Sequence, residues 1–226
     1  MSILKSVLAA FASATLFTIA ASAATQPALS GPDVFRLSYF VNETFSCTGG
    51  NCTPTGIAPG LDDHIYIVNP GTSGGNLCAN IYVWDPSEEL VSCCATAITP
   101  NELVTTTVGG LLTNPASAKD TTPHSGVIKI ISSTVPSGGH CNPATVGKSG
   151  GGAVTPELLS WMVHLFPAGF SGFSDGEATE EEFLPGTLSA AEEGLDVNGC
   201  AAFAGLSGAG TCVGPVEAPA VRSHLK

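Results

Sequence analysis

Basic residues are scarce in this chain. Seven Lys and Arg stand against nineteen Asp and Glu, which gives a formal net charge of −12 at pH 7. Because the resulting negative field repels phosphate groups, the composition argues against nucleic acid or an anionic lipid surface as a partner. Charged residues make up only 12% of the chain, while Gly and Pro number 27 and 16. This balance is typical of a secreted, loop-rich β protein rather than a cytosolic enzyme.

Long apolar runs are also few. One follows Lys5 near the N-terminus, runs from Val7 to Ile19, and precedes the small residues Ala21-Ser22-Ala23. This order is the pattern of a signal peptide with its cleavage site. We therefore expect residues 1–23 to be removed, and we expect a secreted, periplasmic or extracellular mature chain without a transmembrane anchor.

The spacings that bind transition metals are absent. The five histidines, His64, His124, His140, His164 and His224, form neither an H-x-H nor an H-E-x-x-H motif. His140 beside Cys141 is the one hint of a soft-metal ligand pair, and a disulfide at Cys141 would remove it.

An acidic segment from Asp175 to Glu182 places oxygen ligands at alternate positions, as a calcium site would require. The EF-hand spacing fails, because Glu180 stands where that loop needs glycine. The alternative is an acidic helix start that complements the helix dipole. We predict no metal and no cofactor, with calcium as the minor alternative.

Catalytic motifs lack their expected context. Ser73 lies in a G-x-S-x-G pattern, but a predicted strand follows it where a nucleophile elbow needs a helix. Glu157, Ser160 and His164 would fall on one face of a predicted helix, with no nucleophile context around them. A pair of glycosidase carboxylates cannot be placed from a single sequence. We therefore predict no catalytic residue.

Cysteines, by contrast, are numerous. An even number in an exported chain favours disulfides over metal sites, because an oxidising compartment lets disulfides persist. The disulfide candidates are Cys47, Cys52, Cys78, Cys93, Cys94, Cys141, Cys200 and Cys212. Cys47 and Cys52 enclose a Gly-Gly turn, so we expect them to pair.

The strongest β pattern is a hairpin over residues 77–98. Its strands alternate β-branched and aromatic residues and meet at a turn with Pro86 and Ser87 in the centre. That turn would bring Cys78 opposite the neighbourhood of Cys93 and Cys94. Because adjacent strand residues point to opposite faces, we expect one of the two to close the hairpin with Cys78. The other would reach Cys141 or the C-terminal segment.

Further strands are predicted over 34–42, 64–69, 103–108 and 126–132. A Gly-rich link joins 64–69 to the hairpin, so we expect these strands to be neighbours in one antiparallel sheet. Lys129 marks either a solvent-facing position or a sheet edge. The Gly, Ser and Pro content of 135–154 predicts a long loop that a disulfide at Cys141 pins in place.

Helix signals begin after residue 154. Thr155-Pro156-Glu157 has the features of a helix start, and the pattern continues to Phe166. Capping boxes at Thr179 and Ser189 predict short helices near residues 180 and 190. Cys200 and Cys212 are close enough in sequence to pair.

The combination of LCANIYVWDPSEELVSCC, TPNEL, GVIKI and LSAAEE with the last two cysteines resembles a family of uncharacterised secreted bacterial proteins. Members of that family have two further cysteines, at the positions of Thr96 and Gly214 here. If those two pair in relatives, the resemblance implies that the end of the chain lies beside the second hairpin strand. The family has no known activity, so the resemblance implies no function.

These patterns predict a mainly β protein with an antiparallel β-sandwich-like core, short C-terminal helices and disulfides. We expect the β core over residues 24–154 and a short helical segment with a flexible tail, packed on that core, over 155–226. We expect a non-enzymatic binding, adhesion or envelope-structural module, with an extracellular or envelope protein or a glycan as the partner class. The alternative is a secreted hydrolase with a loop-built site.

Overall fold

The computed structural model describes residues 34–41, 44–48, 51–56, 62–112, 123–166, 177–207 and 210–212. All of them belong to one compact unit formed by residues 31–226. The expected signal peptide lies outside the described residues.

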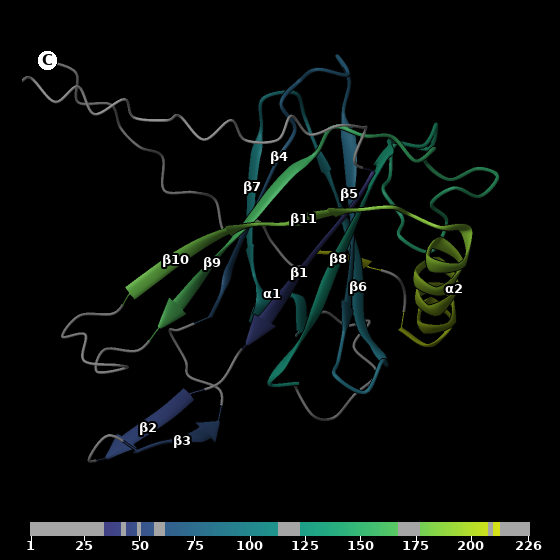
Figure 1. The fold of residues 1–226 in the computed structure, drawn as a ribbon. Coiled ribbons are helices and arrows are strands. Elements are labelled where there is room, and N and C mark those ends of the chain that lie inside the picture. The colour runs from purple at the N-terminus through teal and green to yellow at the C-terminus, as the bar shows by residue number, and fades with distance from the viewer. Residues whose placement is uncertain are drawn as a thin grey trace, which may run out of the picture. The chain divides into compact units, whose positions relative to one another are not determined.

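Two packed β-sheets and one helix form three layers (Figure 1). The six-stranded sheet has the order β11 (Leu184–Gly186), β1 (Phe35–Val41), β8 (Ser125–Thr134), β5 (Leu77–Trp84), β6 (Leu90–Ile98) and β12 (Gly210–Thr211). The four-stranded sheet has the order β10 (Glu177–Glu182), β9 (Leu159–Phe166), β4 (His64–Val68) and β7 (Leu103–Thr107). The remaining elements are the hairpin β2 (Thr44–Thr48) and β3 (Asn51–Gly56) and the helices α1 (Val108–Leu112) and α2 (Ala190–Ser207). The predicted fold class is confirmed.

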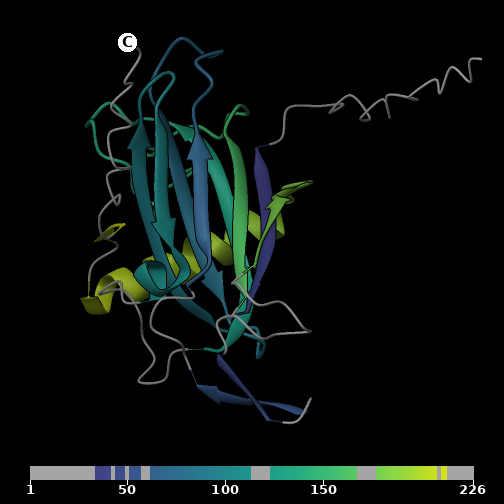
Figure 2. The ribbon, with the colours of Figure 1, turned by 90° about the vertical axis from the view of Figure 1, so that its left-hand side faces the viewer.

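The central strands of the six-stranded sheet are covered on both faces, because their side chains alternate between two apolar clusters. Ile81 and Val83 of β5 pack toward the four-stranded sheet, together with Ile65 and Met162 from that sheet. Tyr82 of β5 and its neighbours pack on the opposite face, against α2. Figure 2 shows the four-stranded sheet in front and α2 behind. Every residue of β5 is buried as a result.

The hairpin turn is the predicted one, but its register differs. Glu88 N donates to Asp85 O across Pro86 and Ser87. Glu88 then adopts a left-handed conformation (φ 61°), and a bulge follows between Val83 and Trp84 in the β5–β6 pairing. Glu88 and the bulge each insert one residue, so β6 pairs with β5 two positions away from the predicted register. A shift of two positions leaves each side chain on the face of the sheet where it was predicted.

Because of this shift, Cys78 lies opposite Ala97, and the predicted disulfide from Cys78 to Cys93 or Cys94 is wrong. Cys78 bonds to Cys141 instead, which confirms that a disulfide pins the loop over 135–154.

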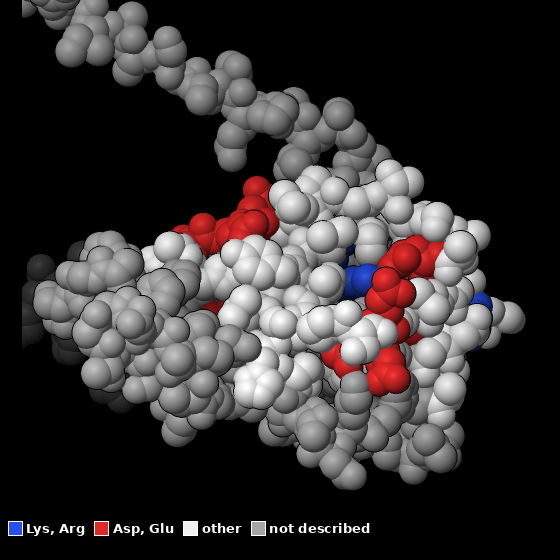
Figure 3. Space-filling model, turned by 60° about the horizontal axis from the view of Figure 1, so that its bottom comes forward, with Lys and Arg blue, Asp and Glu red and all other residues white. Residues whose placement is uncertain are grey.

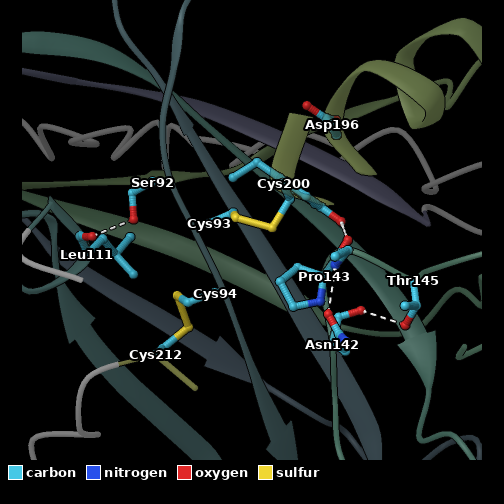
Figure 4. Close-up of a disulfide and its surroundings, with 12 residues drawn as sticks. Ser92, Cys93, Cys94, Leu111, Asn142, Pro143, Thr145, Asp196, Cys200 and Cys212 are labelled. Atoms are coloured by element: carbon cyan, nitrogen blue, oxygen red, sulfur yellow. Dashed lines mark hydrogen bonds between the residues drawn. A yellow bond between two sulfur atoms is a disulfide. The ribbon is translucent and has the colours of Figure 1, made fainter. Parts of the chain in front are cut away.

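The adjacent cysteines point to opposite faces of β6, as strand alternation predicts (Figure 4). Cys93 bonds to Cys200 on α2, and Cys94 bonds to Cys212 after β12. Cys200 and Cys212, although close enough in sequence to pair, therefore bond to β6 and not to each other. β12 pairs in parallel with β6, so the end of the described chain lies beside the second hairpin strand, as the family resemblance implied.

Cys47 and Cys52 lie opposite each other in the backbone register of β2 and β3. The disulfide between them stays a prediction, because their side chains lie outside what the structure describes.

Two of the predicted C-terminal helices are strands. Residues 159–166 form β9 between β4 and β10, and residues 177–182 form β10. The apparent helix start fails at Glu157, whose φ of 122° cannot begin a helix. Backbone pairing with β4 and burial of Met162 outweigh the local capping signals. The helix predicted near residue 190 is confirmed as α2, with Ser189 Oγ accepting from Glu192 N at 3.1 Å.

Two further expectations are corrected. β4 belongs to the four-stranded sheet and is not a neighbour of β5, because the Gly-rich link carries the chain from one sheet to the other. Lys129 lies on the interior strand β8, with its side chain 16% exposed beneath α2.

None of the helices among the described residues is long and apolar enough to cross a membrane.

Candidate ligand-binding surface

The outer face of the four-stranded sheet carries an aromatic pair at its centre. The register places Tyr66 of β4 opposite Trp161 of β9, and Trp161 opposite Glu182 of β10. The two rings are almost parallel, at 8°, with their centroids 5.7 Å apart. Such a cross-strand pair stabilises the sheet and leaves the half-buried Trp161 between an aromatic neighbour and an acidic one.

A hollow lies on the acidic side of Trp161, between β9 and β10. Its volume is about 410 Å³, and it is lined by Leu159, Ser160, Trp161, Glu180 and Glu182. Leu159 is 37% exposed although it is a large apolar side chain. Ser160 is 1% exposed, and its Oγ has no hydrogen-bond partner among the described residues. The hollow thus combines an aromatic ring, an aliphatic side chain and two carboxylates, whereas the Ser160 side chain belongs to the buried face of β9 with Met162 and His164.

The carboxylates at the hollow remain available to solvent. Arg36, which is buried on β1, lies 3.3 Å from Glu182 Oε1 and also donates to the carbonyl of Phe183. This contact orients Glu182, whose side chain is still 52% exposed. Glu180 is exposed as well. Figure 3 shows that acidic side chains gather in separate groups on the face in view, one of them beside basic side chains.

A histidine cluster lies on the inner side of the same two strands. His164 Nδ1 is 2.9 Å from Asp63 Oδ2, and His164 Nε2 is 3.5 Å from Glu181 Oε2. The ring of Tyr39 stacks on the imidazole at 5.1 Å. The hydrogen bond with Asp63 raises the pKa of His164, although burial opposes this change. Both members of the Asp63–His164 pair belong to the four-stranded sheet, and Tyr39 contacts the pair from β1 of the six-stranded sheet. Among the described residues no Ser, Thr or Cys hydroxyl or thiol is hydrogen-bonded to this pair.

A second buried ionic cluster fastens α2 to the six-stranded sheet. Lys129 Nζ pairs with Glu192, lies 3.7 Å from Asp196 Oδ1 and sits over the Trp84 ring at 4.5 Å. Trp84 Nε1 donates to Asp196 Oδ1 at 2.9 Å. Burial raises the pKa of Asp196 to about 6, although Lys129 opposes this change. Burial, followed by the charges of Asp196 and Glu193, also raises the pKa of Tyr82. These contacts serve packing, because the helix covers them.

The residues that the sequence singled out for catalysis are not brought together. Ser73 lies in an exposed turn after β4, and its Oγ donates to the carbonyl of Gly75. His164 pairs with Asp63, which precedes β4. Ser73 and the Asp63–His164 pair therefore lie at opposite ends of that strand. Glu157, Ser160 and His164 share no helix face, because β9 is a strand.

The acidic segment also differs from its expected form. Residues 177–182 are extended, so Glu181 points to His164 while Glu180 and Glu182 line the outer hollow. Asp175 lies outside the described residues. Within the described part of the chain, no group of three or more His, Cys, Asp or Glu side chains is arranged to hold a metal ion.

Sequence reasoning missed Trp161 and the glutamates as one surface because both segments were interpreted as helices. The burial of residues 159–166 alternates with period 2, with Ser160, Met162 and His164 buried, but the residues between them are apolar too, so the sequence carries no clear polar–apolar alternation. Comparison of the chain with known proteins adds nothing to this geometry, because no family model, curated protein or solved structure matches it.

Proposed function

We propose that this protein is an exported, non-enzymatic binding module, and that the hollow beside Trp161 is its ligand-binding surface. The observation that carries the proposal is the composition of that hollow. An exposed Leu159, an aromatic ring and two outward carboxylates line one concave surface. Concave sites that combine apolar side chains with a few polar groups are the usual form of a ligand site.

Export is supported by the disulfides. Three described bonds tie β5 and β6 to a loop, to α2 and to the segment after β12. Such bonds persist in oxidising compartments, including the periplasm and the cell exterior. An extracellular or envelope location would place the hollow in contact with envelope components.

The test compares binding of the mature protein to envelope fragments of its native host. Trp161→Ala removes the ring from the hollow, whereas Leu195→Ser removes an exposed apolar side chain from α2 on the other side of the molecule. We expect the bound fraction to fall at least fivefold for Trp161→Ala and to stay unchanged for Leu195→Ser. Equal binding by all three proteins would contradict the proposal, and so would hydrolytic turnover of envelope polymers by the purified protein.

A further inference from the structure

The strand that carries the two carboxylates lies at an edge of its sheet. β10 pairs with β9 on one side, and among the described residues no strand pairs with its other side. Ala178, Thr179 and Glu180 are exposed. The free backbone N–H and C=O groups of such an edge are a template for one more strand, unless side chains prevent it.

The charges of β10 determine which strand could be added. Glu180 and Glu182 lie on the same face, two residues apart, which is about 6.6–6.8 Å along a strand. Side chains on one face of an added strand recur at the same spacing. A second copy of β10 would place glutamates against glutamates, and like charges in opposite positions are destabilising. Lys or Arg at alternate positions would instead meet a carboxylate at each step.

The hollow fits the side chain of such a residue. A cation within about 6 Å of a Trp ring is attracted by the ring face, and two carboxylates beside the ring add to the attraction. Leu159 supplies an apolar surface for the methylene stem. The net charge of −12 would also favour encounter with a basic partner. A neutral glycan could stack on Trp161 but would gain nothing from these charges.

Building on the binding function proposed above, we propose that the partner is an extended basic segment of another protein, which adds as a strand to the outer edge of β10 and places a Lys or Arg side chain in the hollow. Backbone hydrogen bonds to β10 would supply the affinity. The alternate carboxylates would select the basic sequence.

Fluorescence anisotropy with defined peptides tests the proposal at physiological salt. The probe is a labelled octapeptide that alternates Lys and Thr, and its comparison is a peptide of the same composition with four Lys followed by four Thr. We expect the alternating peptide to bind at least tenfold more tightly. Equal affinity for the two peptides, displacement by equimolar spermidine, or binding of a neutral oligosaccharide in place of the peptide would overturn the proposal.

Two protein variants locate the binding site. Glu180→Gln/Glu182→Gln should weaken binding of the alternating peptide about tenfold or more. Glu88→Gln/Glu89→Gln removes the same charge from the exposed turn between β5 and β6 and should leave binding unchanged. If both double variants weakened binding of the alternating peptide equally, the loss of net charge alone would explain the effect, and the proposal would be contradicted.

Peptides with methylated backbone amides separate strand addition from charge pairing without any change in the protein. Methylation of one alternate set of amides should abolish binding, and methylation of the other set should be tolerated; tolerance of both sets would overturn strand addition. These peptides also test the proposal if the glutamate variant does not fold. If envelope binding depends on Trp161 but no basic peptide binds, the proposed binding function is supported and the proposed basic partner is wrong.

Discussion

Glu157 combines two unfavourable features at a single residue. Its φ of 122° lies where side chains other than glycine are strained, and its Oε2 is buried without a hydrogen-bond partner among the described residues. Strained backbone costs about 1–3 kcal/mol per residue, and an unsatisfied buried acceptor adds to this cost. The residue lies two positions before β9, at the entry to the strand that carries Trp161.

Glu157→Gly should therefore stabilise the fold. Glycine relieves the strain and removes the unpaired carboxylate, so we expect the free energy of unfolding to rise by about 1 kcal/mol in urea denaturation, after the entropy that glycine adds to the unfolded chain. Ala153→Gly, at a nearby exposed position without a positive φ, serves as the control and should not stabilise. A Glu157→Gly protein less stable than wild type would contradict this prediction. It would mean that the Glu157 side chain stabilises the fold by more free energy than its strained backbone costs.

Among the elements, the disulfides act on different parts of the molecule. Cys93–Cys200 joins β6 to α2 across 107 residues, and Cys78–Cys141 joins β5 to the loop over 135–154 across 63 residues. Loop entropy depends on the logarithm of this separation, so the two bonds should contribute similar global stability, about 4–5 kcal/mol each. Their local effects should differ, because α2 is also held by Val197 and by the Lys129 cluster.

Cys93→Ala/Cys200→Ala should raise hydrogen exchange in α2 and leave the loop over 135–154 protected as in wild type. Cys78→Ala/Cys141→Ala should produce the reverse pattern, because each bond restrains only the element it reaches. Mass spectrometry of peptic fragments after exchange measures both regions in one experiment. Uniform loss of protection in both variants would show that the helix and the loop open together.

The elements that sequence reasoning predicted are those whose local pattern and tertiary environment agree. The hairpin over 77–98 has period-2 alternation and a Pro-Ser turn, and both appear in β5 and β6. Its register could not be predicted, since a left-handed Glu88 and a bulge beside Trp84 leave no clear mark in the sequence. β9 was missed for the opposite reason: its helix-start signal is strong locally, but pairing with β4 and β10 outweighs it. The candidate site depends on that pairing and was missed with it.

At the scale of the whole molecule, two buried groups give stability the same dependence on pH. The pKa of His164 is raised above 6.5, so its contribution is full below pH 6.5 and is lost as the pH rises through the folded-state value. The pKa of Asp196 is raised from 3.8 to about 6, so the folded state holds its proton more tightly than the unfolded state. Its contribution is full below pH 3.8 and is lost as the pH rises through about 6. Both groups therefore favour the folded state more at pH 5 than at pH 8.

We expect the free energy of unfolding to increase when the pH is lowered from 8 to 5, with about 1 kcal/mol of the increase due to Asp196. Asp196→Asn keeps an oxygen to accept from Trp84 Nε1 but cannot titrate, so the increase should shrink by that amount. Glu102→Gln, which removes a carboxylate from the exposed turn before β7, should leave the increase unchanged. Urea denaturation at the two pH values measures all three proteins, and an identical increase in wild type and Asp196→Asn would place the pH dependence elsewhere. Because the Asp196 cluster fastens α2 on the face opposite the four-stranded sheet, this variant should change stability without changing binding at the Trp161 hollow.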